Sequence, residues 1–506
     1  MRCLPFLLLL ALCVPHTAGS QVLANYRYAP PGQVDNIHLI DVNGGIWALA
    51  AHARFGMDSA ATELVFGAPS QSPFVGLRLV LDQPLRRLDH LAELGNGVLL
   101  GGAQFMLGPT RPYLLHTNAL AEPVWSLALD GLTNGQDRIG TILATGSDFT
   151  LYTRAEAPET AFFRVNGGDA GQITSSVRYG VQEDAFFQVM DAVGLGNGME
   201  HAVSGTAELE AAPGERSLLI GVLGGTNERL TMYDMGATGA EVENGQAIIH
   251  AANGDLVVAG SSSDLLEFSA FVMRTALDGS VIWCKRLFNT GGSLYLRDVI
   301  ELPGGDVLVC GGNEDQLGIL ARLTANGDLL WVRRYDPALN GPETFHGFAE
   351  IDQDYLHVIS EDQVVTLDAD LQSCDLQQIA SVSVSDHVPA VQELTLAVSN
   401  VSLTLDTVPI QTADTQYQLD ALCVFENIAE IDGGKHAVAY PNPSDGLFRL
   451  VIPDLRSNTE ILVFTADGRL IDQLPYSGQL DLRYLPAGPY VISVPALGSR
   501  IPVILR

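Results

Sequence analysis

A tight turn followed by an apolar strand that ends in small residues recurs along most of the chain. The clearest copies are 253–260 and 304–312, in which Asn-Gly-Asp and Gly-Gly-Asp lead into runs of Val and Leu. With the second turn residue as anchor, seven copies fall at positions 45, 97, 147, 198, 254, 305 and 353. Successive anchors are 52, 50, 51, 56, 51 and 48 residues apart, so the pattern indicates a repeat of about fifty residues.

A second element follows some of these turns. Residues 271–283 and 319–331 each run from an apolar strand into Asp-Gly or Asn-Gly and out through a strand that contains a tryptophan. Trp283 and Trp331 are 48 residues apart, and a weaker copy ends at Trp125. Both elements are typical of hairpins, so one complete repeat predicts four short antiparallel strands, which form one blade of a β-propeller.

Radial stacking of such blades around an axis buries both faces of each blade. We therefore predict an all-β fold in which residues 21–380 form a propeller of about seven four-stranded blades, with six or eight also compatible with the weaker repeats. We expect Trp47, Trp125, Trp283 and Trp331 to pack between blades; the alternative is a stacking platform for a sugar or quinone. In outline this body resembles the secreted bacterial β-propellers, and that resemblance carries no activity.

The pattern changes after the repeats, over residues 381–435. Residues 394–398 and 401–405 alternate like strands, but no blade turn follows them. We expect an irregular β segment or linker here, which either completes the ring or bridges to the next domain.

The first twenty residues have the features of a secretory signal peptide. Arg2 precedes an apolar run over 4–14, and small residues at 18–20 stand before an expected cleavage site ahead of Gln21. The run is too short to span a bilayer, and no later segment reaches about 18 uninterrupted apolar residues. A secreted chain without a transmembrane segment in its mature part is therefore expected.

The last part of the chain, residues 436–506, carries turns and strands of its own. Asp445-Gly446 and Asp467-Gly468 each separate alternating stretches, as turn residues do between paired strands. About seven short strands in roughly seventy residues predict a small β-sandwich.

Several residues of this part together resemble the type A C-terminal sorting domain of the type IX secretion system (T9SS) of Bacteroidota. The residues that carry the resemblance are Tyr440, Pro441, Asn442, Pro443, Gly446, Asp467, Gly468, Arg469, Gly488 and Tyr490. The resemblance implies that the domain is an address read by the outer-membrane translocon, which would then be a partner of this chain. It also implies that the protein is extracellular or attached to the cell surface. From the residues alone, an ordinary accessory sandwich is the alternative.

Charge and composition narrow the choice of partners. Acidic residues outnumber basic ones by 59 to 27, which gives a formal net charge of −32. This balance repels phosphate backbones, so we expect no nucleic-acid partner. Apolar residues make up 47% of the chain and glycine occupies 51 positions, which is typical of a packed, turn-rich β protein and excludes wholesale disorder.

Four cysteines remain after the signal segment, in a chain expected to pass through an oxidising compartment. We predict a disulfide between Cys374 and Cys423, because the two bracket a stretch without clear repeats. Cys284 and Cys310 lie within β-like runs and are expected to be buried free thiols. Four cysteines permit three full pairings, and the residues alone leave the choice open.

No motif of fixed short spacing points to catalysis. The chain has no His-Glu-x-x-His, no Gly-x-Ser-x-Gly and no phosphate-binding glycine loop, so no catalytic, cofactor-binding or metal residue is assigned. Asp278 and the acids at 368 and 370 could help to bind calcium, but turn chemistry also explains them. We expect a non-enzymatic module that binds a glycan, protein or matrix ligand. The alternative is a secreted hydrolase or lyase with its site in the central channel.

Overall fold

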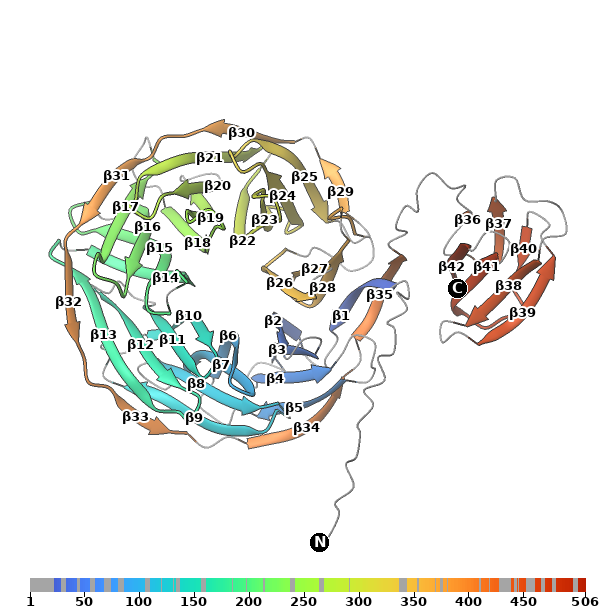
Figure 1. The fold of residues 1–506 in the computed structure, drawn as a ribbon, viewed down its shortest axis with the longest axis horizontal. Helices are drawn as coiled ribbons and strands as arrows, with labels where there is room; N and C mark the ends of the chain where they lie inside the picture. The colour runs from blue at the N-terminus through green and yellow to red at the C-terminus, as the bar shows by residue number, and fades with distance from the viewer. Residues whose placement is uncertain are drawn as a thin grey trace, which may run out of the picture. The chain divides into compact units, whose positions relative to one another are not determined.

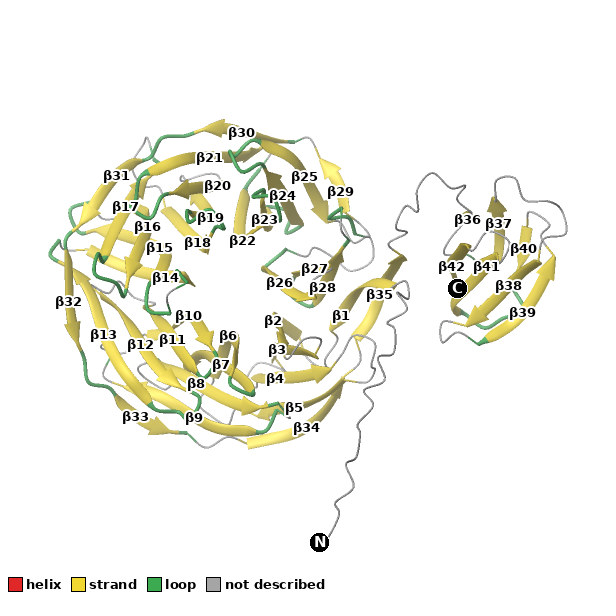
Figure 2. Cartoon of the chain, viewed as in Figure 1, coloured by secondary structure: helices red, strands yellow, loops and turns green. Residues whose placement is uncertain are grey.

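The computed structural model is an all-β protein, and its described residues form 42 strands and no helix (Figure 2). Outside the described residues lie 1–21, 29–32, 43–45, 55–59, 68–73, 81–85, 105–109, 120, 131, 133–136, 156–160, 184, 197, 213, 237–241, 264–267, 291, 336–343, 353–354, 369, 374–375, 380, 409–410, 418, 427–437, 441–443, 445, 452–459, 466–468, 476–478 and 495–498. The chain divides into two compact units, of which Ala24–Val424 is one and the C-terminal residues from Phe425 belong to the other.

The larger unit is a ring of seven antiparallel blades, which we number I to VII in chain order (Figure 1). Blade I contains β2 (Gln33–Val42), β3 (Ile46–Arg54), β4 (Ala60–Gly67) and β5 (Phe74–Val80). Blade II contains β6 (Arg86–Leu94), β7 (Gly97–Gln104), β8 (Arg111–Asn118) and β9 (Pro123–Asp130). Blade III contains β10 (Asp137–Thr145), β11 (Asp148–Ala155), β12 (Ala161–Gly168) and β13 (Ile173–Val181). In each blade the first strand lies nearest the axis (Figure 1).

The next three blades follow the same order. Blade IV contains β14 (Ala185–Gly194), β15 (His201–Leu209), β16 (Arg216–Leu223) and β17 (Arg229–Asp234). Blade V contains β18 (Val242–His250), β19 (Leu256–Ser263), β20 (Phe268–Thr275) and β21 (Val281–Asn289). Blade VI contains β22 (Leu294–Glu301), β23 (Val307–Asn313), β24 (Gly318–Leu323) and β25 (Leu329–Tyr335). A single parallel bridge between Arg216 and Val242 joins blades IV and V.

Blade VII closes the ring with strands from both ends of the propeller. It takes β26 (Gly347–Asp352), β27 (Tyr355–Ile359) and β28 (Gln363–Leu367) from the end of the repeats and β1 (Val22–Tyr28) from the N-terminus. Tyr26 pairs with Val364 in an antiparallel ladder, and Arg27 Nε lies 2.8 Å from a carboxylate oxygen of Asp362. The last blade is therefore completed by the first strand of the chain.

A segment that we call the belt, residues 376–426, runs around the outside of the ring (Figure 1). Its strands are β29 (Leu376–Ile379), β30 (Val382–Asp386), β31 (Ala390–Leu394), β32 (Leu396–Asn400), β33 (Thr404–Thr407), β34 (Gln411–Tyr417) and β35 (Leu419–Glu426). In that order they join the outer edges of blades VI, V, IV, III, II, I and VII. Six of these pairings are antiparallel with a defined register. Each blade thus gains a fifth strand.

The structure confirms an all-β propeller of seven blades and changes two details of the expectation. Each blade has five strands rather than four, because the belt adds one to every edge. The segment expected to be irregular or a linker is part of the propeller as far as β35, so the expected boundary at residue 380 falls inside the propeller. Belt strands bury few side chains, as in β33, whose four residues are all exposed. Their hydrophobic pattern is therefore weak.

The propeller core lies between blades rather than within them. Separate clusters of buried apolar side chains join blades I–II, II–III, III–IV, IV–V, V–VI and VI–VII. Trp125 packs in the cluster between blades II and III, Trp283 between V and VI, and Trp331 between VI and VII. The expected packing of these three tryptophans between blades is confirmed, while the side chain of Trp47 lies outside the described residues.

Glycines within the second strands of blades IV, V and VI explain the small residues of the repeat there. A Cβ atom on Gly205, Gly260 or Gly311 would lie 1.9–2.0 Å from a backbone carbonyl oxygen of the adjacent inner strand. Such contacts are too short for any other residue. These glycines thus let the second strand approach the innermost strand closely.

The C-terminal unit is a two-sheet sandwich, as predicted. One sheet contains β36 (Val438–Tyr440), β37 (Leu447–Val451) and β40 (Gln479–Asp481). The other contains β39 (Leu470–Pro475), β38 (Glu460–Thr465), β41 (Gly488–Val494) and β42 (Ser499–Leu505). Phe448 and Leu480 from the first sheet pack with Val463 and Ile492 from the second, so this unit has a core of its own.

Candidate functional site

The innermost strand of every blade contains a β-bulge. In blades I to VI the extra residues are Asp35, Asp89, Gly140, Met190, Gln246 and Arg297, and β26 has a register shift after Glu350. A bulge bends its strand and redirects the side chains beside it. The ring of bulges around the axis is therefore where side chains of different blades can meet.

Two aspartates that follow bulges tie one blade to the next. Asp191 on β14 accepts hydrogen bonds from Thr141 Oγ1 at 3.3 Å and from the backbone N–H of Ile248 in blade V at 2.9 Å. Asp298 on β22 accepts bonds from the backbone N–H groups of Val299 and of Phe348 in blade VII, both at 2.7 Å. Each carboxylate thus bridges to the inner strand of the following blade.

Asp191 and Asp298 are half-buried residues, and protein atoms surround their carboxyl groups closely. Desolvation raises the pKa of Asp191 to about 6 and that of Asp298 to about 7, while the hydrogen bonds from backbone N–H groups oppose the rise. The charge of Asp191 also raises the pKa of Asp298. Shifts of this size occur at active sites and also in structural networks, so geometry has to distinguish the two.

A polar cluster lies at the junction of blades VI and VII. Arg297 is exposed, and its guanidinium carbon lies 5.3 Å from the centre of the Tyr295 ring. The Tyr295 side chain hydrogen-bonds Thr344, and Thr344 Oγ1 lies 3.3 Å from His346 Nε2. Desolvation and the charge of Arg297 lower the pKa of His346 to about 4. A cation, a phenol, a hydroxyl and a neutral imidazole therefore lie together beside the inner strands.

A second cluster lies buried between blades III and IV. Tyr152 OH is 3.0 Å from His201 Nδ1, and Tyr179 OH donates to Glu228 at 2.9 Å. Burial raises the pKa of both tyrosines, and burial together with the charge of Arg164 lowers that of His201 to about 4. Both tyrosine side chains are fully buried, so this cluster is part of the packing between blades.

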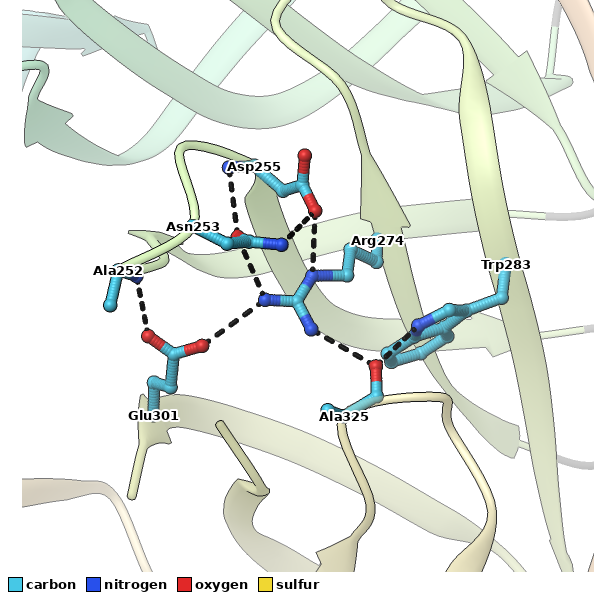
Figure 3. A network of polar contacts seen from close by, with 7 residues as sticks. All are labelled: Ala252, Asn253, Asp255, Arg274, Trp283, Glu301 and Ala325. Atoms are coloured by element: carbon cyan, nitrogen blue, oxygen red, sulfur yellow. Dashed lines mark hydrogen bonds and ion pairs between the residues drawn. The ribbon is translucent and has the colours of Figure 1, made fainter. Parts of the chain in front are cut away.

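A third network lies where the turns of blades V and VI meet (Figure 3). Arg274, only 4% exposed, forms ion pairs with Asp255 at 3.2 Å and Glu301 at 3.1 Å. Arg274 Nη1 and Trp283 Nε1 both donate to the carbonyl oxygen of Ala325, each at 3.0 Å. Since the bonds hold one blade against the next, this network stabilises the ring.

The acids considered for calcium binding are used within turns. Asp278 accepts bonds from the backbone N–H and the hydroxyl of Ser280, and Asp368 accepts bonds from the N–H groups of Asp370 and Gln372. Within the described part of the chain, no group of three or more His, Cys, Asp and Glu side chains is placed to hold a metal ion.

Half of the predicted sorting residues fall within the described residues. Tyr440 ends β36 and pairs with Arg449. Gly446 has a φ of +99°, and a Cβ there would lie 2.8 Å from the Arg483 backbone, so glycine is required. Tyr490 is 7% exposed and donates to the Pro486 carbonyl at 2.8 Å. Arg469 is exposed and Gly488 begins β41. Pro441, Asn442, Pro443, Asp467 and Gly468 lie outside the described residues.

Of the four cysteines after the signal segment, two have described side chains and two do not. Cys284 and Cys310 are buried free thiols, as expected, and desolvation raises the pKa of Cys284 to about 12 and that of Cys310 well above its usual value. Cys374 and the side chain of Cys423 lie outside the described residues. Their disulfide therefore stays a prediction.

Similarity to known proteins is limited to solved structures. No family model and no curated protein matches the chain. The chain is similar to Sqt1 of Chaetomium thermophilum, with 13% identity, 69% of this chain and 98% of that one covered, and a TM-score of 0.42. It is also similar to an α-L-arabinanase of Penicillium chrysogenum, with 14% identity, 69% of this chain and 98% of that one covered, and a TM-score of 0.40. A third similar structure is an ulvan lyase of polysaccharide lyase family 25, with 11% identity, 69% of this chain and 96% of that one covered, and a TM-score of 0.46.

The described residues contain no helix of the length and apolar character needed to cross a membrane. The sequence motifs had indicated neither Asp191 and Asp298 nor the Tyr295–His346 cluster. For the two aspartates, the only signal in the sequence was the repeat period: Asp191 and Asp298 occupy the same position after the bulge in two blades.

Proposed function

We propose that this chain is an exported protein whose propeller binds a glycan, protein or matrix component outside the cell and does not catalyse a reaction. The observation that carries this proposal is the bonding of the inner-strand acids. Asp191 and Asp298 have raised pKa values, but the oxygens of each accept hydrogen bonds that fasten neighbouring blades. A general acid or base has to reach the substrate with a free oxygen, and these groups are better suited to holding a rigid binding scaffold.

A secreted hydrolase or lyase is the second candidate, and one observation favours it. Asp298, with a pKa of about 7, follows Arg297, and Arg297 in turn lies close enough to His346 to lower its pKa. A carboxyl that is half protonated at neutral pH and a neutral imidazole, both near Arg297, have the ionisation required for acid–base chemistry.

A screen of the purified secreted chain on a glycan array and against polysaccharide substrates distinguishes the binding protein from the hydrolase or lyase. The proposal predicts saturable binding without turnover, and binding that Asp298→Asn leaves within about twofold. Turnover of any substrate that is lost in Asp298→Asn would establish the enzyme instead. Thermal unfolding of the variant checks that the ring is intact, and Asp386→Asn, on the exposed belt, serves as the matched control.

We also propose that the C-terminal sandwich directs export by the type IX secretion system. Two features support this: the sorting residues are grouped in one small unit, and that unit has a core of its own. A chain that ends before Tyr440 keeps its N-terminal segment and its propeller, so it should cross the inner membrane and accumulate, folded, in the periplasm. The full chain should reach the cell surface or the medium.

Cell fractionation in a Bacteroidota host, with protease accessibility of whole cells as the readout, compares the two chains. Equal surface exposure of the truncated and the full chain would reject the sorting role. An Arg483→Ala variant of the full chain, altered at an exposed ion pair of the sandwich outside the sorting residues, should be exported normally.

A further inference from the structure

We propose that the Tyr295–His346 cluster at the junction of blades VI and VII binds the oxyanion of an acidic oligosaccharide, with Arg297 as the residue that holds the oxyanion. This inference rests on the proposed binding function and names the class of ligand. A uronate carboxylate and a sulfate ester share the required chemistry, and the experiment below distinguishes them.

Arg297 is placed to receive a ligand. It is the extra residue of the bulge on the innermost strand of blade VI, and it is exposed while Leu296 beside it is fully buried. Its guanidinium lies against the Tyr295 ring at 5.3 Å. Stacking on an aromatic face orients the planar group and leaves its N–H edge available, and that edge matches the two oxygens of a carboxylate or sulfate.

Several other arginines of the blades are held by partners within the protein, either by acids or, as for Arg286 and Arg333, by backbone carbonyl oxygens. Arg274 is paired with Asp255 and Glu301, and Arg322 with Asp306. Among the described residues, the guanidinium of Arg297 contacts an aromatic ring and forms no ion pair. The charge of the exposed Glu361 reaches Tyr295 beside it, but no acid is paired with Arg297 in the described part of the chain. In a chain with a net charge of −32, such an exposed arginine beside the axis is a local attraction for an anion.

Neutral polar groups beside Arg297 suit sugar hydroxyls. The Tyr295 phenol, the Thr344 hydroxyl and the His346 ring form a connected series, with 3.3 Å between Thr344 Oγ1 and His346 Nε2. With a pKa of about 4, His346 stays neutral at physiological pH, so one ring nitrogen donates and the other accepts. Since Nε2 already faces Thr344, the neutral groups that remain for sugar hydroxyls are Nδ1 of the ring and the oxygens of Tyr295 and Thr344.

Isothermal titration of the full secreted chain at physiological salt tests the proposal with a uronate trisaccharide, a sulfated disaccharide and neutral maltotriose. We expect one or both acidic sugars to bind and maltotriose to bind at least tenfold more weakly. Arg297→Gln should weaken acidic-sugar binding about tenfold or more, because a charge-assisted bidentate contact is lost. Arg297→Lys should be intermediate, since it keeps the charge and loses the planar fork.

Arg216→Gln is the matched control. It removes the same charge from the third strand of blade IV, where Arg216 is paired with Glu208, and should change affinity less than twofold. Equal affinity of wild type and Arg297→Gln, or equal affinity for maltotriose and the acidic sugars, would overturn the inference while leaving the binding function standing. Failure to bind these sugars while another ligand binds would also overturn it, and failure to bind any ligand would reject both. The ratio of uronate to sulfate affinity identifies which oxyanion the site prefers.

Discussion

The blades and the belt use the same antiparallel ladder but differ in what their side chains do. All seven residues of β23 in blade VI are buried, whereas all four residues of β33 in the belt are exposed. Backbone pairing is therefore enough to place a strand on the edge of a blade, while the packing between blades supplies most of the hydrophobic stabilisation. Changes inside the blades should consequently cost much more than changes in the belt.

The largest effect is expected at the network between blades V and VI. Arg274→Ala would leave the partly buried carboxylates of Asp255 and Glu301 without their cation, so the free energy of unfolding should fall by about 3–5 kcal/mol. Chemical denaturation of the full chain measures the loss. The belt offers the control: Lys285 pairs with Asp386, which is 85% exposed, and Asp386→Ala should cost less than about 1 kcal/mol. Similar losses at both sites would contradict the comparison.

A smaller effect is expected where the belt does reach the core. Leu394 of β31 is 3% exposed and packs with Leu230 and Met232 between blades III and IV, so Leu394→Ala should cost about 2–4 kcal/mol. Val391 on the same strand is 54% exposed, and Val391→Ala should change stability by only a few tenths of a kcal/mol. If the two variants unfold at the same temperature, Leu394 does not anchor the belt.

The predicted disulfide would join the two ends of the belt. β28, which precedes Cys374, and β35, which contains Cys423, both belong to blade VII, so the belt makes one circuit and returns to its origin. A bridge that closes a loop of about fifty residues should contribute about 2–4 kcal/mol. Non-reducing peptide mapping should find the linked pair, and reduction should lower the unfolding temperature of the wild type but not of Cys423→Ser. Two free thiols in the secreted protein would reject it.

The smallest effect, taken per unit of pH, is the pH dependence of stability. Because the pKa of Asp298 is about 7 in the folded chain and near 3.8 when unfolded, the folded state binds the extra proton between about pH 4 and 7. The contribution of Asp298 to the free energy of unfolding is therefore fully present below about pH 4 and is lost as the pH rises through 7. Relative to Asp298→Asn, the free energy of unfolding of the wild type should fall by about 1.4 kcal/mol per pH unit, and by up to about 4 kcal/mol across the whole window.

His201 and His346 have lowered pKa values, so their contributions to the free energy of unfolding increase as the pH rises. These contributions are the same in the wild type and in Asp298→Asn. The difference between the two unfolding curves therefore isolates Asp298. Parallel curves from pH 4 to 8 would contradict the raised pKa.

The blades could be predicted from sequence because their signals are local. Turns such as Asn253-Gly254 and small residues such as Gly260 recur with the period of the ring. Gly254 has a φ of +91° in its turn, and Gly260 lies close against the adjacent strand, so each reflects a requirement within one blade. The sequence indicated strands at 394–398 and 401–405, but it did not show that the belt adds a strand to every blade, because an exposed strand such as β33 buries no side chains against a neighbour. The pairing of Tyr26 with Val364 was equally hidden, since no local signal connects residues so far apart.

The inner-strand site was unpredictable for a related reason. Arg297 lies on β22 and His346 directly before β26, and only the packing of the segment that leads into blade VII against blade VI brings Tyr295 and Thr344 into contact. The bulge that exposes Arg297 depends on the pairing of β22 with β23, which a single strand does not reveal. The C-terminal sandwich was easier to predict, because its turns and its core lie within about seventy residues of one another.

The position of β1 between β28 and β35 has a consequence for the order of assembly. The first strand of the propeller to leave a ribosome or a membrane pore finds its neighbours only when strands several hundred residues later have arrived. Pairings across such sequence separations form slowly, and the edge of β1 stays open until then. We therefore expect ring closure to be the last and slowest step of folding, timed by the arrival of the end of the belt, so that a chain still in transit stays free of a locked tertiary structure.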